Sequence, residues 1–61
     1  MQLTIIYVLA FGSWQFIVED INDPDAVLLG KDFACQDECV AAARRMTGRP
    51  HLAITETQEI Y

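Results

Sequence analysis

Two apolar segments near the N-terminus decide the fold that the sequence predicts. Residues 3–11 read Leu-Thr-Ile-Ile-Tyr-Val-Leu-Ala-Phe and residues 14–18 read Trp-Gln-Phe-Ile-Val, with Gly12-Ser13 between them. β-Branched and aromatic residues favour strands, and a two-residue Gly-Ser connection is typical of a tight hairpin of type II′ or I′. The N-terminal third of the chain is therefore predicted to be a β-hairpin.

The predicted connection also sets the pairing of the two strands. With Gly12-Ser13 as the loop, one face carries the pairs Phe11–Trp14, Leu9–Phe16 and Tyr7–Val18, continued by Leu3 and Ile5. Cross-strand pairs of this kind stabilise a sheet by roughly 0.2–1 kcal/mol each. The opposite face carries Ala10, Gln15 and a largely apolar set: Ile6, Val8, Ile17, Glu19 and Ile21.

Further elements follow the hairpin. Residues 19–25, rich in Asn, Asp and Pro, are predicted to form a loop, and residues 26–29 a short third strand closed by Gly30. A helix is expected from Gln36 to Thr47, with Cys35 in the N-cap position and Gly48 after its end. Residues 51–57 alternate weakly and suggest an edge-type strand, and residues 58–61 are expected to form a flexible tail.

These elements predict one α+β domain over residues 1–61: a small antiparallel sheet, formed by the hairpin and one or two further strands, with a single helix packed on one face. Cys39, Val40, Ala43 and Met46 fall on one stripe of the helix and are expected to contact the sheet. A chain of this size is marginally stable alone, because it buries only about 60% of the surface that its unfolded form exposes.

Charge and hydropathy exclude several classes of protein. Nine acidic residues against four basic ones give a net charge of −5, which disfavours binding to a nucleic-acid backbone. Residues 1–18 carry no charge, but Gly12-Ser13 interrupts them, and the first residues lack the positive charge of a signal peptide. We therefore expect no membrane segment and a cytoplasmic protein.

Part of the chain resembles a known family. Gly-Ser-Trp-Gln-Phe at 12–16, Asp-Ile-Asn at 20–22 and Phe-Ala-Cys-Gln-Asp-Glu-Cys-Val-Ala-Ala at 33–42 follow the order of the YegP-like family of small uncharacterised bacterial domains. The Asn-Gly turn usual in that family is replaced by Asn22-Asp23-Pro24-Asp25. The resemblance implies a βββα unit that pairs with a second copy, and it assigns no activity to any residue.

No group of residues has the pattern of a catalytic or metal site. Cys35 and Cys39 are spaced i, i+4, which is neither a Cys-x-x-Cys redox motif nor a zinc knuckle. The acidic loop lacks the Gly and Glu of a calcium-binding loop, since Asp25 and Lys31 stand in their places when Asp20 is counted as the first position. His51, the only histidine, has no evident partner. We predict no enzyme activity and no cofactor.

The second face of the hairpin is the strongest candidate for function. A single helix can cover one face, so Ile6, Val8, Ile17, Glu19 and Ile21 are predicted to form a protein-binding surface, unless the C-terminal segment folds across it. We expect a homodimer through this face or an edge strand, and an unidentified protein partner. The hypothesis is a small accessory or inhibitory protein of the kind that phages and mobile elements direct against host complexes. The alternative is a thiol-based redox or regulatory protein that uses Cys35 and Cys39.

Overall fold

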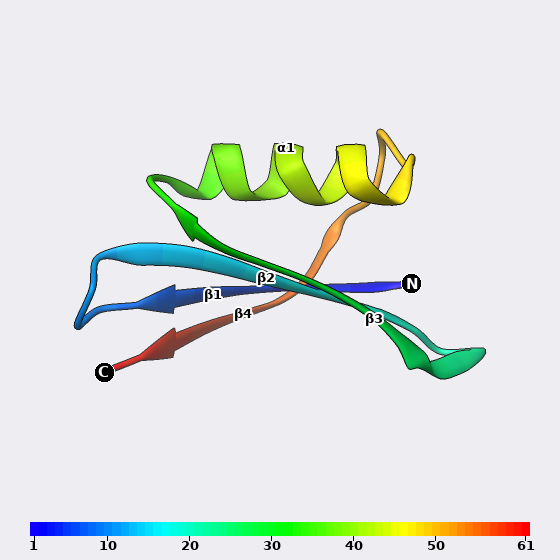
Figure 1. Ribbon diagram of the computed structural model, residues 1–61, viewed down its shortest axis with the longest axis horizontal. Helices are drawn as coiled ribbons and strands as arrows, with labels where there is room; N and C mark the ends of the chain where they lie inside the picture. The colour runs from blue at the N-terminus through cyan, green and yellow to red at the C-terminus, as the bar shows by residue number, and fades with distance from the viewer.

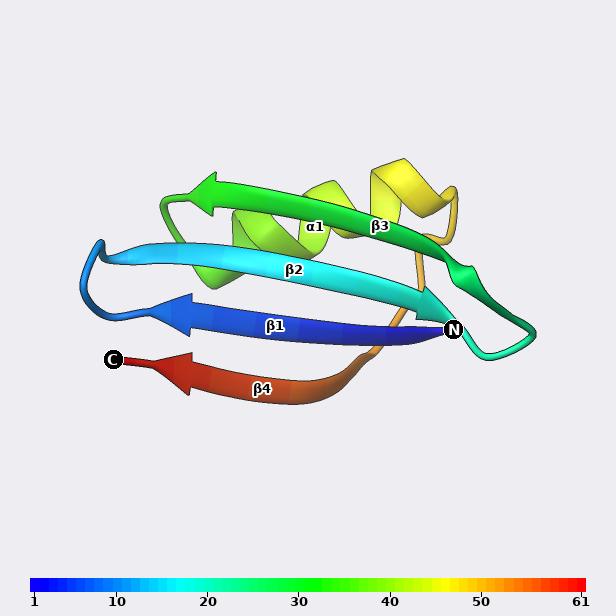
Figure 2. The same cartoon turned by 60° about the horizontal axis from the view of Figure 1, so that its bottom comes forward.

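The computed structural model describes all residues 1–61 and contains four strands and one helix. In chain order these are β1 (Gln2–Val8), β2 (Ser13–Asp20), β3 (Asp23–Phe33), α1 (Gln36–Thr47) and β4 (Ile54–Ile60) (Figure 1). The strands form one sheet in the order β3-β2-β1-β4, with α1 on one side of it (Figure 2). The predicted α+β class with a single helix on one face is confirmed.

The sheet is mixed rather than wholly antiparallel. β1 pairs antiparallel with β2, and β2 pairs antiparallel with β3, as expected. β4 instead runs parallel to β1, because α1 returns the chain to the end of the sheet where β1 begins. β3 and β4 are therefore the two edge strands.

The hairpin is present, but its predicted register was wrong by four residues. Val8 pairs with Ser13 and Tyr7 with Trp14, so the loop is Leu9 to Gly12 rather than Gly12-Ser13. Gly12 ends the loop with φ 59°, a left-handed conformation that glycine adopts at little cost. This longer loop brings Leu3 opposite Val18 and Ile5 opposite Phe16. Because the shift is an even number of residues, each strand residue stays on its predicted face.

The segment predicted as a loop over residues 19–25 is a second, tighter hairpin. Ile21 and Asn22 make the turn, and the backbone N–H of Asn22 donates to Oδ1 of Asp20 at 2.9 Å. Asx hydrogen bonds of this kind close turns without glycine. β3 is consequently 11 residues long, much longer than the predicted 26–29.

Helix α1 has the predicted bounds. Cys35 is the N-cap residue, as predicted, but its side chain makes no capping hydrogen bond. Gly48, in the left-handed conformation, donates its N–H to the carbonyl oxygen of Arg45, and the N–H of Arg49 donates to that of Arg44. The buried helix residues are Cys39, Val40, Ala42 and Ala43, whereas the side chain of Met46 is exposed.

The core lies between α1 and the central strands, where Leu3, Ile5, Phe16 and Val18 face the helix. Leu52, in the segment after α1, completes the core, and its carbonyl group accepts a bond from Nε of Arg44 at 3.1 Å. The prediction of a tail at residues 58–61 was wrong for 58–60, which pair with Ile6 to Val8 as part of β4. No helix of the protein has the length and apolar character needed to cross a membrane.

Candidate functional site

The side of the sheet opposite α1 is not covered by any element of the chain (Figure 1). Pairing fixes which side chains it carries, since directly paired residues share a face. Ile17 pairs with Thr4 and Leu29, Glu19 pairs with Val27, and Val8 pairs with Ile60. We call the apolar residues of this side the open face: Ile6, Val8, Ile17, Val27, Leu29 and Ile60.

Four of the five residues predicted for protein binding lie on this side of the sheet. Ile6 and Val8 form its centre and are themselves buried, in β1 between the paired strands β2 and β4. Ile17 is half-buried and Glu19 is exposed at the rim. Ile21, predicted for the same surface, does not lie on it. It lies in the β2–β3 turn, where its side chain is 73% exposed.

Sequence reasoning missed three residues of the open face. Val27, Leu29 and Ile60 are exposed, and Leu29 most of all at 66%. Val27 and Leu29 alternate with Leu28, a period-2 pattern that could have placed them together once the length of β3 was known. Ile60 could not be found in this way, because its segment was interpreted as a tail.

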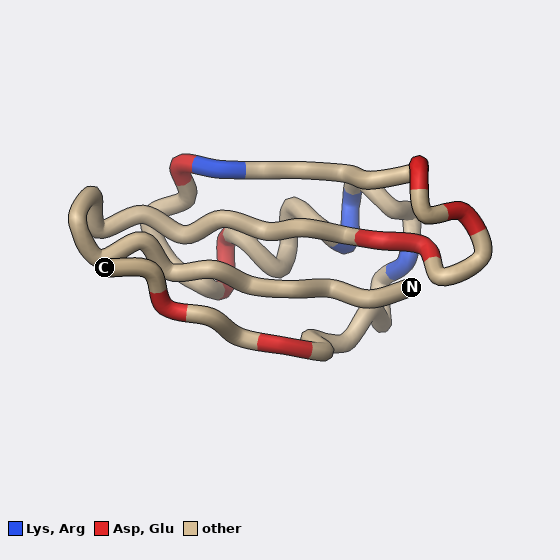
Figure 3. The backbone as a smooth tube through the Cα atoms, turned by 90° about the horizontal axis from the view of Figure 1, so that it is seen from below, with Lys and Arg blue, Asp and Glu red and all other residues tan.

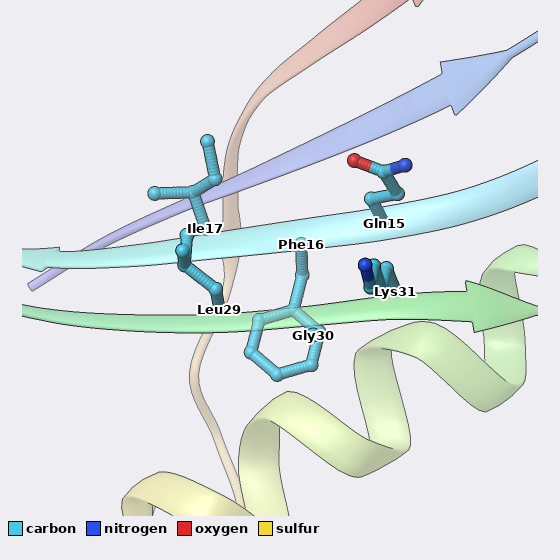
Figure 4. A pocket seen from close by; sticks show the side chains of 6 residues that line it. All are labelled: Gln15, Phe16, Ile17, Leu29, Gly30 and Lys31. Carbon is cyan, nitrogen blue, oxygen red and sulfur yellow. The ribbon is translucent and has the colours of Figure 1, made fainter.

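A depression of about 460 Å³ lies on the open face between β2 and β3. Figure 4 shows Gln15, Ile17 and Leu29 directed away from α1, whereas Phe16 points towards it. The depression is mainly apolar, with Gln15 and Lys31 as its polar residues. It is large enough for an aliphatic or aromatic side chain of a partner.

Charge is distributed unevenly around this face. Glu19, Asp20, Asp23 and Asp25 gather at the β2–β3 turn, at one end of the sheet (Figure 3). Glu56 lies on the same side of the sheet as the open face because it pairs with Thr4. Lys31 is the basic residue next to the open face. A partner would therefore meet an apolar centre with a mostly acidic rim.

The two cysteines differ in environment. Cys35 is exposed at the start of α1, and Cys39, on the face of α1 that packs against the sheet, is fully buried. Burial, with a smaller contribution from the neighbouring Cys35, raises the pKa of the Cys39 thiol to about 11. Because the thiolate is the reactive form, this environment disfavours nucleophilic chemistry at Cys39.

The other residues considered for chemistry are not brought together. His51 is exposed in the turn before β4. No group of three or more His, Cys, Asp or Glu side chains is placed to hold a metal ion. Comparison with protein-family models, with curated proteins and with solved structures finds no match. The resemblance to the YegP-like family stays a hypothesis.

Proposed function

We propose that this protein is a non-enzymatic protein-binding module and that the open face is its binding surface. The observation that carries the proposal is the exposure of Val27, Leu29 and Ile60 around the buried centre of a sheet face that no element covers. Contiguous apolar surface with a polar rim is typical of protein interaction sites. An inhibitory accessory role would follow if the module occupied a functional surface of a host complex.

The thiol-based alternative has less support. It needs two cysteines that can approach each other and ionise, whereas Cys39 is buried and has a raised pKa. Dithiol exchange would require the N-terminal turn of α1 to open, because Cys39 packs in the same core as Leu3 and Phe16.

Leu29→Glu tests the binding function. The side chain is largely exposed, so the charge should leave the fold intact while placing a carboxylate within the proposed contact, on its β3 side. Met46→Glu is the matched control, because Met46 is an exposed apolar residue on the opposite side of the molecule. Partners captured by the wild type and by Met46→Glu, but not by Leu29→Glu, would support the proposal. Identical capture by all three would contradict it.

A further inference from the structure

The two edges of the sheet differ in whether their backbone groups are free to pair with a further strand. The outer edge of β3 contains Pro24, which has no N–H to donate, and an irregularity opposite Gln15 where Asp32 has φ 68°. Proline and bulges are common means of blocking an edge. In β4 all seven residues are exposed, none is proline or lysine, and pairing with β1 is regular from Glu56 to Ile60.

Backbone geometry shows which groups of β4 face outward. The N–H of Leu9 donates to the carbonyl oxygen of Ile60 at 2.8 Å, so Ile60 turns its polar groups towards β1. In a parallel pair these orientations alternate along the strand. Gln58 and Glu56 therefore also face β1, whereas the N–H and C=O groups of Thr57 and Glu59 point away from the sheet and can pair with an added strand.

Two carboxylates flank this edge, one on each side of the sheet. Glu56 pairs with Thr4 on the side of the open face, and Glu59 pairs with Tyr7 on the side of α1. Each is held by the residue two positions later: Gln58 Nε2 donates to Glu56 Oε1, and Tyr61 Oη donates to Glu59 Oε2, both at 3.0 Å.

Each carboxylate keeps further acceptor positions for a second donor. Residues 50–61 contain no Lys or Arg, and Figure 3 shows the acidic positions on β4 without a basic one. Both the outward backbone groups and the carboxylates are thus arranged along one exposed edge, and no basic residue of the strand neutralises them.

We propose that β4 binds an extended basic peptide, which adds as a fifth strand and places two arginines, three residues apart, against Glu56 and Glu59. Glu56 and Glu59 are three residues apart, so the arginines that pair with them must also be three residues apart. This holds whether the peptide runs parallel or antiparallel to β4. Arginine fits best since its guanidinium can bond a carboxylate in two places. The net charge of −5 would attract such a segment. This inference concerns the edge, goes beyond the proposed function of the open face, and the two can fail separately.

An NMR titration of the full chain with a synthetic peptide tests the proposal. The probe is acetyl-Ile-Arg-Thr-Val-Arg-Thr-amide, and the control, acetyl-Ile-Arg-Thr-Arg-Val-Thr-amide, has the same composition with the arginines two residues apart. We expect the amide signals of Thr57 and Glu59 to shift, and the control to bind at least about threefold more weakly because one exposed ion pair is lost. Equal affinity for both peptides, shifts confined to β3 or the open face, or no shift at all would overturn the proposal.

Variants of the protein separate backbone pairing from charge. Thr57→Pro removes an outward N–H that the fold does not use, so circular dichroism should be unchanged while the dissociation constant rises at least about tenfold. Thr57→Ala is the matched control and should bind normally. Glu59→Gln and Glu56→Gln should each weaken binding about two- to fivefold, whereas Glu38→Gln, on the exposed side of α1, should not.

Equal effects of the three Glu→Gln changes would indicate unspecific attraction and overturn the proposal, even if Thr57→Pro failed to fold. Sedimentation of the wild type alone adds a further test. A dimer that Thr57→Ala preserves and Thr57→Pro abolishes would show that the edge is occupied by a second copy, which would also overturn it.

Discussion

Gly30→Ala should destabilise the protein through one contact across β2 and β3. Gly30 pairs with Phe16, whose ring lies against the glycine and is fully buried. A Cβ atom at residue 30 would overlap Cε2 of the ring and lie 2.6 Å from Cζ and 2.8 Å from Cδ2. Carbon atoms pack best at about 3.5–4.0 Å, so the ring must move. Glycine is needed here because of this close approach.

The expected magnitude is the difference of two effects. Forcing an extra methyl group into a packed site costs about 1–3 kcal/mol. Replacing glycine by alanine also restricts the unfolded chain, which offsets about 0.4–1 kcal/mol of that loss. A net loss of about 1–2 kcal/mol should lower the melting temperature by roughly 5–15 °C in a domain of this size.

Urea unfolding followed by the fluorescence of Trp14, the single tryptophan, would measure this loss. Phe16→Leu provides the second arm of a double-mutant cycle, because the smaller side chain leaves room for the new methyl group. Gly30→Ala should therefore cost clearly less in the Phe16→Leu background. Equal losses in both backgrounds, or a Gly30→Ala protein as stable as the wild type, would refute the reasoning.

Three further predictions concern stability and thiol chemistry. Because Asp32 has φ 68°, Asp32→Gly should raise the free energy of unfolding in urea by about 0.5–1 kcal/mol, whereas Asp32→Val should lower it by at least about 1 kcal/mol. Phe11→Ser should change the free energy of unfolding by less than about 0.5 kcal/mol because the ring is 83% exposed. Tyr7→Ser should lower it by more, since the ring of Tyr7 stacks on that of Trp14 with centroids 4.8 Å apart. A larger loss for Phe11→Ser than for Tyr7→Ser would favour the two-residue loop, in which Phe11 pairs with Trp14. Burial raises the pKa of Cys39 from 9.0 to about 11. The buried neutral thiol therefore contributes fully to the free energy of unfolding below pH 9, and this contribution declines towards pH 11, because over that range the thiol ionises in the unfolded chain but not in the folded one. The free energy of unfolding should therefore fall more steeply over that range in the wild type than in Cys39→Ala.

The faces of the sheet could be predicted from the sequence, but the register could not. Alternation in residues 3–8 and 14–18 distinguishes the two sides of the hairpin. A register error of an even number of residues leaves each side chain on its predicted side, whereas an odd error would reverse the sides of one strand. A two-residue and a four-residue loop both fit Gly12, since each can use its left-handed conformation. The choice between them depends on Leu3 and Ile5 packing with Phe16 and Val18 beneath α1, which is tertiary information.

The predicted edge-type strand at residues 51–57 is present as β4, but its last three residues were predicted to be a tail, for a different reason. Residues 54–60 contain Glu, Thr and Gln with isoleucine only at the ends, because an edge strand with neither side covered by a helix needs little apolar surface. Its partner, β1, supplies the hydrogen bonds, and no local pattern reveals a parallel neighbour 51 or 52 residues away. The same lack of cover that obscured the end of β4 in the sequence leaves all seven of its residues exposed.

The dimensions of the single helix explain why both candidate surfaces remain uncovered. A helix of 12 residues is about 18 Å long and, with its side chains, about 10–12 Å wide, whereas the molecule extends 33 Å along its longest axis. One such helix can cover parts of two or three strands on one side. It packs against β1, β2 and β3 and leaves β4 and the opposite side of the sheet without a covering element (Figure 2). The open face and the β4 edge are thus consequences of one architecture; they adjoin along β4, which contributes Ile60 to the open face, but they present different groups to a partner. Because Leu29 lies on the far side of the sheet from Thr57 and Glu59, a Leu29→Glu protein that still binds the basic peptide would demonstrate that they act independently.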